Sequence, residues 1–175
     1  MSFEPVPGQY YRIVAKHSGK VAEVRHAQIH RGTPIQQGDW VGGEYQQFHF
    51  HDQGGGAWNI VCRSTGRSFD VAGESWNDDV GIIQWDRHDY STNQQFEFLP
   101  AGGGHYYIGA RHSRKFLCMK EGGTDYGVPV VQHVWNGGDH FQFSFVPCEP
   151  IVSARALREV VLRGADPIRD AVLSL

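Results

Sequence analysis

One sequence pattern occurs three times along this chain. Its middle copy runs from Trp58 to Phe98 and contains a Ser-Thr-Gly turn, a Phe-Asp-Val segment and a closing Gln-Phe-Glu-Phe segment. The first phenylalanines of the three closing segments, Phe48, Phe96 and Phe143, lie 48 and 47 residues apart. A fixed period of this length indicates a repeat architecture. We therefore expect three copies of one structural unit, at about residues 9–56, 57–104 and 105–147.

Each copy has the alternation and the turns of about four short strands. In the middle copy, Phe96 and Phe98 should point to one face, while Gln95 and Glu97 point to the other. The turn at Ser64-Thr65-Gly66 ends one strand and begins the next. The four strands of this copy are expected near residues 57–63, 67–72, 81–86 and 94–99.

A four-strand unit of this kind cannot bury its own apolar face. We expect the three units to close around a pseudo-threefold axis, which also removes open sheet edges. Equivalent apolar residues of the three units should then meet in one core. The predicted core consists of Ile13, Ile35, Ile60, Ile82, Ile108, Val24, Val71, Val130, Met119, Phe48, Phe50, Phe96, Phe98, Phe143 and Phe145.

Composition and charge exclude several classes of function. The chain has 175 residues and a formal net charge of -3 without a Lys/Arg-rich run, which argues against nucleic-acid binding. It has no apolar stretch near 20 residues, so no membrane span is expected. No secretory signal is visible, so we expect a cytoplasmic protein, with release from the cell left open. The cysteines Cys62, Cys118 and Cys148 have no metal-type spacing and are expected to be reduced.

The composition changes at about residue 149. We expect one domain over residues 1–148 and a helical extension over residues 149–175. Ser153 is a good N-cap for a helix that ends at Gly164, and Asp166-Pro167 can start a second short helix. The apolar stripe of these helices should be covered by the barrel, by a second copy in a homodimer, or by a missing downstream domain. A membrane-surface helix is less favoured, because the polar face carries both signs of charge.

Three residues of the middle copy suggest a binding site. Asp70 lies between two apolar residues and should point outward from its strand. Closure of the unit would bring it near Trp85 and Asn93 on one shallow surface. A carboxylate can accept two hydrogen bonds from sugar hydroxyls, an indole can pack on the apolar face of a pyranose, and an amide both donates and accepts. Gln94 could brace Asp70 or the backbone.

The segments Phe69-Asp70-Val71, Ile82-Ile83-Gln84-Trp85-Asp86 and Asn93-Gln94-Gln95-Phe96 resemble a ricin B-type lectin repeat. Phe96 stands where the family's Gln-x-Trp motif usually has Trp. The resemblance covers about residues 9–147 and implies a β-trefoil: a six-stranded barrel with three hairpins and up to three sugar sites. The overall expectation is an all-β fold of three pseudo-symmetric four-strand repeats with a short C-terminal helical extension.

The resemblance also implies roles for single residues. Asp70 would be the carboxylate that binds hydroxyls, Trp85 the stacking platform and Asn93 a polar contact. Gln94 would be a supporting brace. The loop residues His88 and Tyr90 are further candidates for contact with the sugar.

The other two copies depart from this pattern. The first copy has Glu23, Gly38 and Tyr45 at the three positions, with Trp40 as an alternative platform. The third copy has Cys118, His133 and His140 at these positions, and Phe141 replaces the glutamine of the closing segment. We therefore expect one working site, in the middle copy.

Two classes of function remain open from the sequence. The first is a non-enzymatic lectin for galactose-type or N-acetylgalactosamine-type sugars, with glycans as partners and no metal or cofactor; the sugar type is implied by the resemblance alone. The second is a protein-interaction or receptor-targeting module of a larger toxin-like protein. A purely structural interpretation, in which Asp70 is a ladder residue and Trp85 a partly packed aromatic, also stays open. No nucleophile motif or carboxylate pair indicates an enzyme.

Overall fold

The computed structural model describes residues 2–148, which form twelve strands and six short 3₁₀ helices. The helices expected in residues 149–175 lie outside the described part of the chain. No helix in the described part is long and apolar enough to cross a membrane.

Six strands form a closed barrel. Their antiparallel pairings run β1–β12–β9–β8–β5–β4 and return to β1, so every barrel strand has two neighbours in the ring. Closure leaves no open edge for a further chain to add to. The barrel strands are β1 (Tyr11–Ala15), β4 (Phe48–Gly54), β5 (Ala57–Cys62), β8 (Phe96–Gly102), β9 (His105–Ala110) and β12 (Phe143–Pro147).

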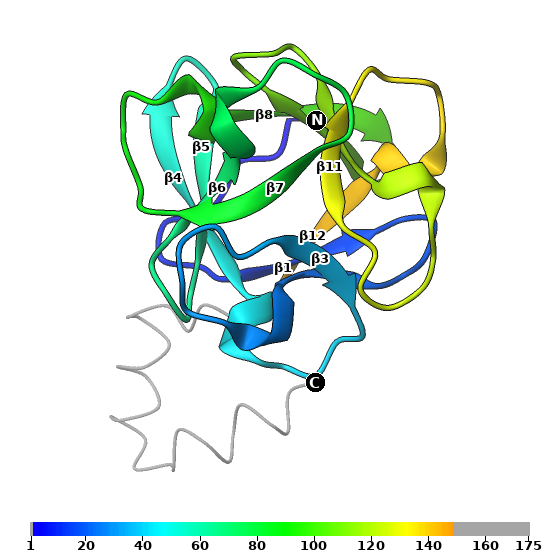
Figure 1. The fold of residues 1–175 in the computed structure, drawn as a ribbon, viewed down its shortest axis with the longest axis horizontal. Helices are drawn as coiled ribbons and strands as arrows, with labels where there is room; N and C mark the ends of the chain where they lie inside the picture. Colours follow the sequence, from blue (N-terminus) through cyan, green and yellow to red (C-terminus); the bar gives the residue numbers. More distant parts are fainter. Residues whose placement is uncertain (1, 149–175) are drawn as a thin grey trace, which may run out of the picture.

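The other six strands form three hairpins that meet around the pseudo-threefold axis. In Figure 1, β3, β7 and β11 are grouped around the centre of the molecule. Bridges join neighbouring hairpins at Val131–Gly81, Pro34–Ile83 and Gln36–Pro129. The hairpin strands are β2 (Val21–Val24), β3 (Ile35–Gly38), β6 (Ser68–Val71), β7 (Val80–Trp85), β10 (Phe116–Met119) and β11 (Val130–His133).

A short 3₁₀ helix follows the first hairpin strand of each repeat, and another precedes its closing strand. The helix before each closing strand places a polar or aromatic residue beside the hairpin of its repeat. The six helices are η1 (Arg25–Ala27), η2 (Glu44–Gln46), η3 (Ala72–Glu74), η4 (Thr92–Gln94), η5 (Lys120–Gly122) and η6 (Asp139–Phe141).

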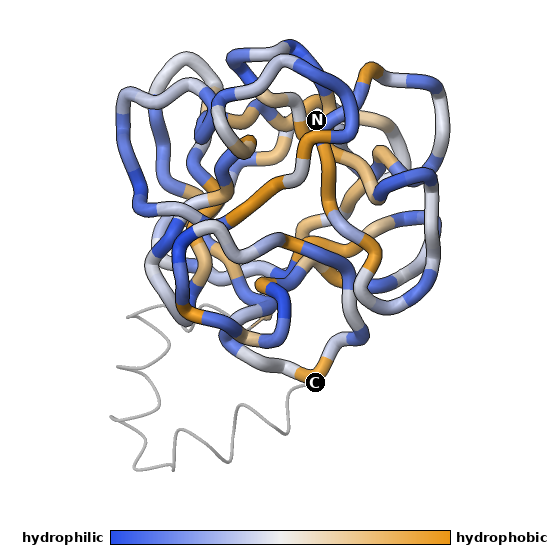
Figure 2. The backbone as a smooth tube through the Cα atoms, in the orientation of Figure 1, coloured by the Kyte–Doolittle hydropathy of each residue, from blue (hydrophilic) through white to orange (hydrophobic). Residues whose placement is uncertain are grey.

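The predicted core is the observed core. All fifteen predicted residues are buried and belong to one apolar cluster. Figure 2 shows the same segregation, with hydrophobic segments towards the middle and hydrophilic loops around them. The prediction of an all-β trefoil with three four-strand repeats is confirmed, because alternate apolar residues of every unit converge on one axis.

Each hairpin is linked to a neighbouring repeat by one of three equivalent glutamines. Gln84 donates through Nε2 to the carbonyl oxygens of Gln28 (2.9 Å) and His30 (2.8 Å). Its Oε1 accepts from the hydroxyl of Thr65 (2.9 Å). Gln37 and Gln132 make the corresponding three bonds in the other repeats, and all three glutamines are fully buried. These side chains supply partners to backbone groups that closure removes from water.

Candidate functional site

The middle hairpin places Asp70 and Trp85 on the same face. Asp70 of β6 lies opposite Ile83 of β7, and Ser68 lies opposite Trp85. Asp70 and Trp85 are therefore diagonal neighbours across the antiparallel pair, close enough for both to contact one ligand. Asn93 reaches the same face from η4.

These residues line a hollow of about 380 Å³, here called the middle-repeat hollow. Its remaining walls come from residues that the sequence patterns did not single out. Gly73 and Glu74 belong to η3, which follows β6, and have positive φ angles of 64° and 53°, so the chain turns sharply beside the hollow. The lining residues are Asp70, Gly73, Glu74, Ile83, Trp85 and Asn93.

Asp70 is more enclosed than strand alternation predicted. Only 7% of its surface is exposed, because η4 packs over the end of β6. Gln94 donates through Nε2 to Asp70 Oδ2 (2.8 Å) and to the Asp86 carbonyl oxygen (2.9 Å). Its Oε1 accepts from the His88 amide (2.8 Å). Gln94 thus holds the carboxylate at the hollow and ties it to the following loop.

Burial has an electrostatic consequence for Asp70. Desolvation raises the pKa of its carboxyl above the ordinary value of 3.8, and hydrogen bonds from Gln94 and Asn93 partly oppose this rise. The nearby Glu74 carboxylate also raises this pKa. Asp70 is therefore a carboxylate that gains from hydrogen-bond donors supplied by a ligand.

The indole of Trp85 is accessible and is held from the neighbouring repeat. Its exposed fraction is 37%. The guanidinium carbon of Arg31 lies 5.9 Å from the centre of the ring. Arg31 also pairs with Asp86, which accepts from Arg67 Nε (3.0 Å) as well. The Gly32 amide donates to the Gln84 carbonyl oxygen (2.9 Å) and completes this attachment of the first-repeat loop.

Asn93 and the two loop candidates differ in position. Asn93 is buried, donates through Nδ2 to the Val71 carbonyl oxygen (3.3 Å) and lines the hollow. His88 is exposed, and only its backbone is linked to this region through Gln94. Tyr90 is 97% exposed and lines a different hollow, beside His51. The structure therefore does not bring the side chains of His88 and Tyr90 to the middle-repeat hollow.

A family comparison identifies the kind of domain that carries this hollow. A family model described as ricin-type beta-trefoil lectin domain-like matches residues 2–85 and 92–155. The chain belongs to this ricin-type lectin family. The matched segments include Asp70, Trp85, Asn93 and Gln94, whereas the loop with His88 and Tyr90 falls between them.

Solved structures place this ricin-type domain among β-trefoils. The designed 3-fold symmetric protein ThreeFoil is 36% identical, with a TM-score of 0.76 over 78% of this chain and 97% of ThreeFoil. An exo-beta-1,3-galactanase from Clostridium thermocellum is 32% identical, with a TM-score of 0.78 over 82% of this chain and 31% of the enzyme. The Macrolepiota procera ricin B-like lectin, solved with lactose, is 20% identical, with a TM-score of 0.68 over 82% and 99% of the two chains. No curated protein sequence matches the chain.

The first repeat of the ricin-type domain keeps an acid but lacks the platform. Glu23 is buried and accepts from Gln36 Nε2 (2.9 Å) and Gln46 Nε2 (2.8 Å). A Cβ atom on Gly38, at the position equivalent to Trp85, would lie 2.4 Å from the Glu23 carboxylate. The longer acid therefore occupies the space in which a platform side chain would begin.

The third repeat lacks the acid altogether. Cys118 is buried at the position equivalent to Asp70, and desolvation raises the pKa of its thiol to about 12, so it carries no charge at neutral pH. His133, at the platform position, has its Nδ1 2.7 Å from the Val134 carbonyl oxygen. Phe141 is buried where Gln94 braces Asp70 in the middle repeat. Across residues 2–148, no group of three His, Cys, Asp or Glu side chains could hold a metal ion.

The contacts of Arg31 with Trp85 and Asp86 lead to a prediction about affinity for sugar. Replacing Arg31 with Ala removes both the ion pair and the cation–π contact, so the indole gains freedom that a ligand must then restrict. We expect sugar affinity to fall about threefold, which corresponds to roughly 0.7 kcal/mol. Titration with the sugar measures this change in affinity. Arg87→Ala is the matched control, because the exposed Arg87 side chain pairs with Asp89 and not with Trp85. Equal affinity of the Arg31 variant and the parent would show that Arg31 does not hold the Trp85 indole in place for the sugar.

Proposed function

We propose that the chain is a non-enzymatic carbohydrate-binding module that binds the terminal sugar of a glycan in the middle-repeat hollow. The observation that carries this proposal is the shared position of a carboxylate and an accessible indole. Two adjacent ring hydroxyls would donate to Asp70, and the apolar face of the ring would pack on Trp85. The side-chain amide of Asn93 would contact a further hydroxyl.

A galactose-type or N-acetylgalactosamine-type sugar is the preferred ligand in this proposal. The support is the family membership and the fold shared with the Macrolepiota procera lectin, which was solved with lactose. An enzymatic role is not favoured, because the galactanase match covers 31% of that enzyme and leaves the rest of it unmatched. One shallow site binds weakly, so adhesion would need several copies displayed together.

A glycan array tests this function. The protein should bind glycans with terminal galactose or N-acetylgalactosamine when displayed at high density, and free galactose should compete. Binding restricted to other terminal sugars would reject the proposed specificity. If no glycan binds even at high density, the carbohydrate function is wrong, and the protein-interaction module becomes the better explanation.

The raised pKa of Asp70 predicts a pH dependence of binding. Sugar hydroxyls donate to the ionised carboxylate, so affinity should be constant at neutral pH and fall as the pH drops through the pKa of Asp70. Because desolvation raises that pKa, the fall should be centred above the ordinary value of 3.8. Titrations across the acidic range measure it. A midpoint at or below the ordinary value would show that Asp70 is not the group that controls binding.

A further inference from the structure

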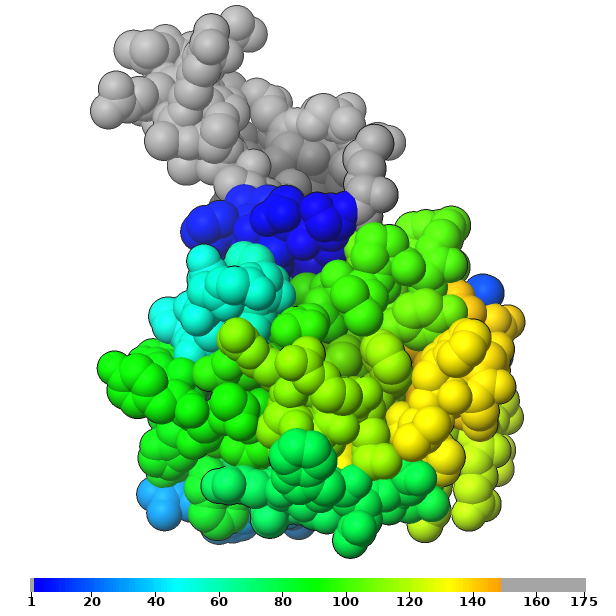
Figure 3. All heavy atoms as spheres, turned by 90° about the horizontal axis from the view of Figure 1, so that it is seen from above, coloured from blue at the N-terminus to red at the C-terminus, as the bar shows by residue number. Residues whose placement is uncertain are grey.

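The N-terminal segment only partly closes the end of the barrel that lies opposite the hairpins. Phe50, Phe98 and Phe145 converge there, with ring centroids 4.7–5.2 Å apart. Phe3 packs on all three, nearest to Phe145 (4.5 Å). Figure 3 shows the N-terminal residues, in dark blue, against one end of the molecule.

The next layer of aromatic residues shows which part of the barrel end Phe3 does not cover. Tyr11, Trp58 and Tyr106 are equivalent, since they pair with the first phenylalanine of the closing strands. Phe3 contacts the rings of Tyr11 (5.4 Å) and Tyr106 (5.7 Å). Trp58 instead stacks on Phe98 at 6.5 Å with an interplanar angle of 8°. One of the three sectors, at Trp58, is therefore left partly open.

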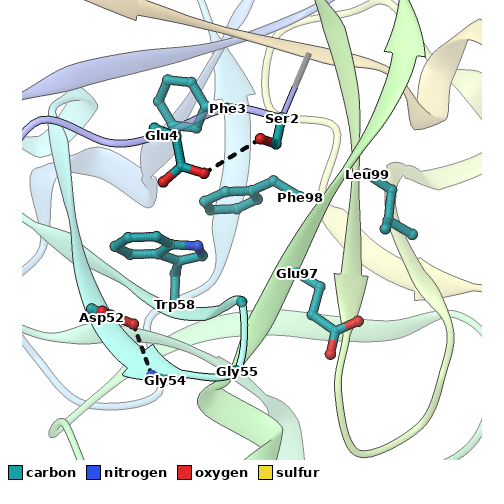
Figure 4. Close-up of a pocket in the computed structure, with 11 residues that line it drawn as sticks. Ser2, Phe3, Glu4, Asp52, Gly54, Gly55, Trp58, Glu97, Phe98 and Leu99 are labelled. Carbon is teal, nitrogen blue, oxygen red and sulfur yellow. Dashed lines mark hydrogen bonds between the residues drawn. The ribbon is translucent and has the colours of Figure 1, made fainter.

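This sector is a hollow of about 560 Å³, here called the barrel-mouth hollow. It shares no residue with the middle-repeat hollow, and its size suits a small ligand. Figure 4 shows the indole of Trp58 beside Phe98, with Glu4 and Asp52 near it, whereas the Glu97 side chain points to the other side of β8. The lining residues are Ser2, Phe3, Glu4, Asp52, Gly54, Gly55, Gly56, Trp58, Glu97, Phe98 and Leu99.

The rim of the barrel-mouth hollow is acidic. Its ionisable residues are Glu4, Asp52 and Glu97, and no Lys, Arg or His belongs to its lining. Asp52 Oδ1 accepts from the Gly54 amide (2.8 Å) and Glu4 Oε1 from the Ser2 hydroxyl (3.3 Å), so each carboxylate retains an oxygen for a ligand. Arg111, whose guanidinium approaches Gly55, donates to Gln95 (3.0 Å) and does not line the hollow.

We propose that the barrel-mouth hollow is a second saccharide site, specific for an amino sugar with a free ammonium group. The indole of Trp58 would take the apolar face of the ring. The ammonium would donate to the carboxylates of Asp52 and Glu4 in charge-assisted bonds, and the ring hydroxyls would use the remaining acceptors. Two carboxylates near the indole, with no Lys, Arg or His among the described lining residues, favour a positively charged ligand over a neutral one.

NMR titration of the full chain tests this site directly. D-glucosamine, with its amine protonated, should shift the signals of the Trp58 indole NH and the amides of Gly54, Gly55 and Gly56. N-acetylglucosamine, which has the ring without the charge, and cadaverine, which has the charge without the ring, should cause much smaller shifts. Equal shifts from either compound, or no shift from glucosamine, would overturn the proposal.

Variants connect the signals to the contacts. The double variant Asp52→Asn, Glu4→Gln keeps the shape of the rim and should weaken glucosamine binding about tenfold, as should Trp58→Leu. Because Trp58 is half-buried, a dispersed spectrum must first show that this variant is folded. Asp70→Asn, in the middle-repeat hollow, should leave the glucosamine shifts unchanged. Unaltered glucosamine binding in the rim variant would reject the proposal even if Trp58→Leu failed to fold.

Discussion

Replacing Asp70 with Asn should weaken sugar binding about a hundredfold. The asparagine keeps the size of the side chain and can turn its oxygen towards Gln94 Nε2, so the brace survives. The hollow then presents an NH₂ group where the sugar hydroxyls would find a charged acceptor. Loss of hydrogen bonds to a buried charge costs about 3 kcal/mol, which corresponds to that factor.

Titration of the parent and the variant with galactose measures this effect. Asp39→Asn is the matched control, because it makes the same chemical change at an exposed carboxylate that lines neither hollow. The control should bind like the parent. If Asp70→Asn also binds like the parent, the site is wrong even though the protein could still be a lectin. Loss of binding by both variants would point to a general effect of charge.

Replacing Gln132 with Leu should destabilise the fold by about 3 kcal/mol. The leucine leaves the carbonyl oxygens of Ser75 and Asn77 without the donor that both now share at 2.8 Å. The hydroxyl of Ser113 loses its acceptor at the same time. Water cannot replace the side chain easily, because Gln132 is fully buried.

Chemical denaturation measures this loss as a lower free energy of unfolding. Gln53→Leu is the matched control, since the Gln53 side chain makes one bond, to the carbonyl oxygen of its neighbour Asp52 (3.3 Å). The control should change the free energy of unfolding by less than about 0.5 kcal/mol. A similar loss in both variants would show that the three-bond arrangement of Gln132 has no special weight.

Most of the fold could be predicted from the sequence because the same pattern of strands and turns occurs three times along the chain. Alternation fixed which side of each strand is buried, and the period aligned Ile13 with Ile60 and Ile108 in one layer. The six-stranded barrel with three hairpins came from the family resemblance, and the closed ring of strand pairings confirms it. The hydrogen bonds by which buried glutamines link the repeats were not predicted, because Gln84 and the carbonyl groups that it bonds lie more than 50 residues apart.

The candidate site was predictable in part. Asp70, Trp85 and Asn93 do line one hollow, and Gln94 does brace the acid. Their role in binding sugar stays a prediction. The prediction that Asp70 points outward missed its burial, since strand alternation does not include the 3₁₀ helix that packs over it. Gly73 and Glu74 were missed because positive φ angles there leave no mark in the periodic pattern.

By itself, the sequence determined the repeat, the layers of the core and the acid–indole pair of the middle repeat. These depend on spacing along one chain, which is fully contained in the order of the residues. The tertiary structure decided that Arg31 holds Trp85, that Tyr90 turns away from the middle-repeat hollow and that Phe3 leaves one sector of the barrel open at Trp58. Such features depend on how segments far apart in the sequence fill space once the barrel has closed, and periodicity carries no information about that packing.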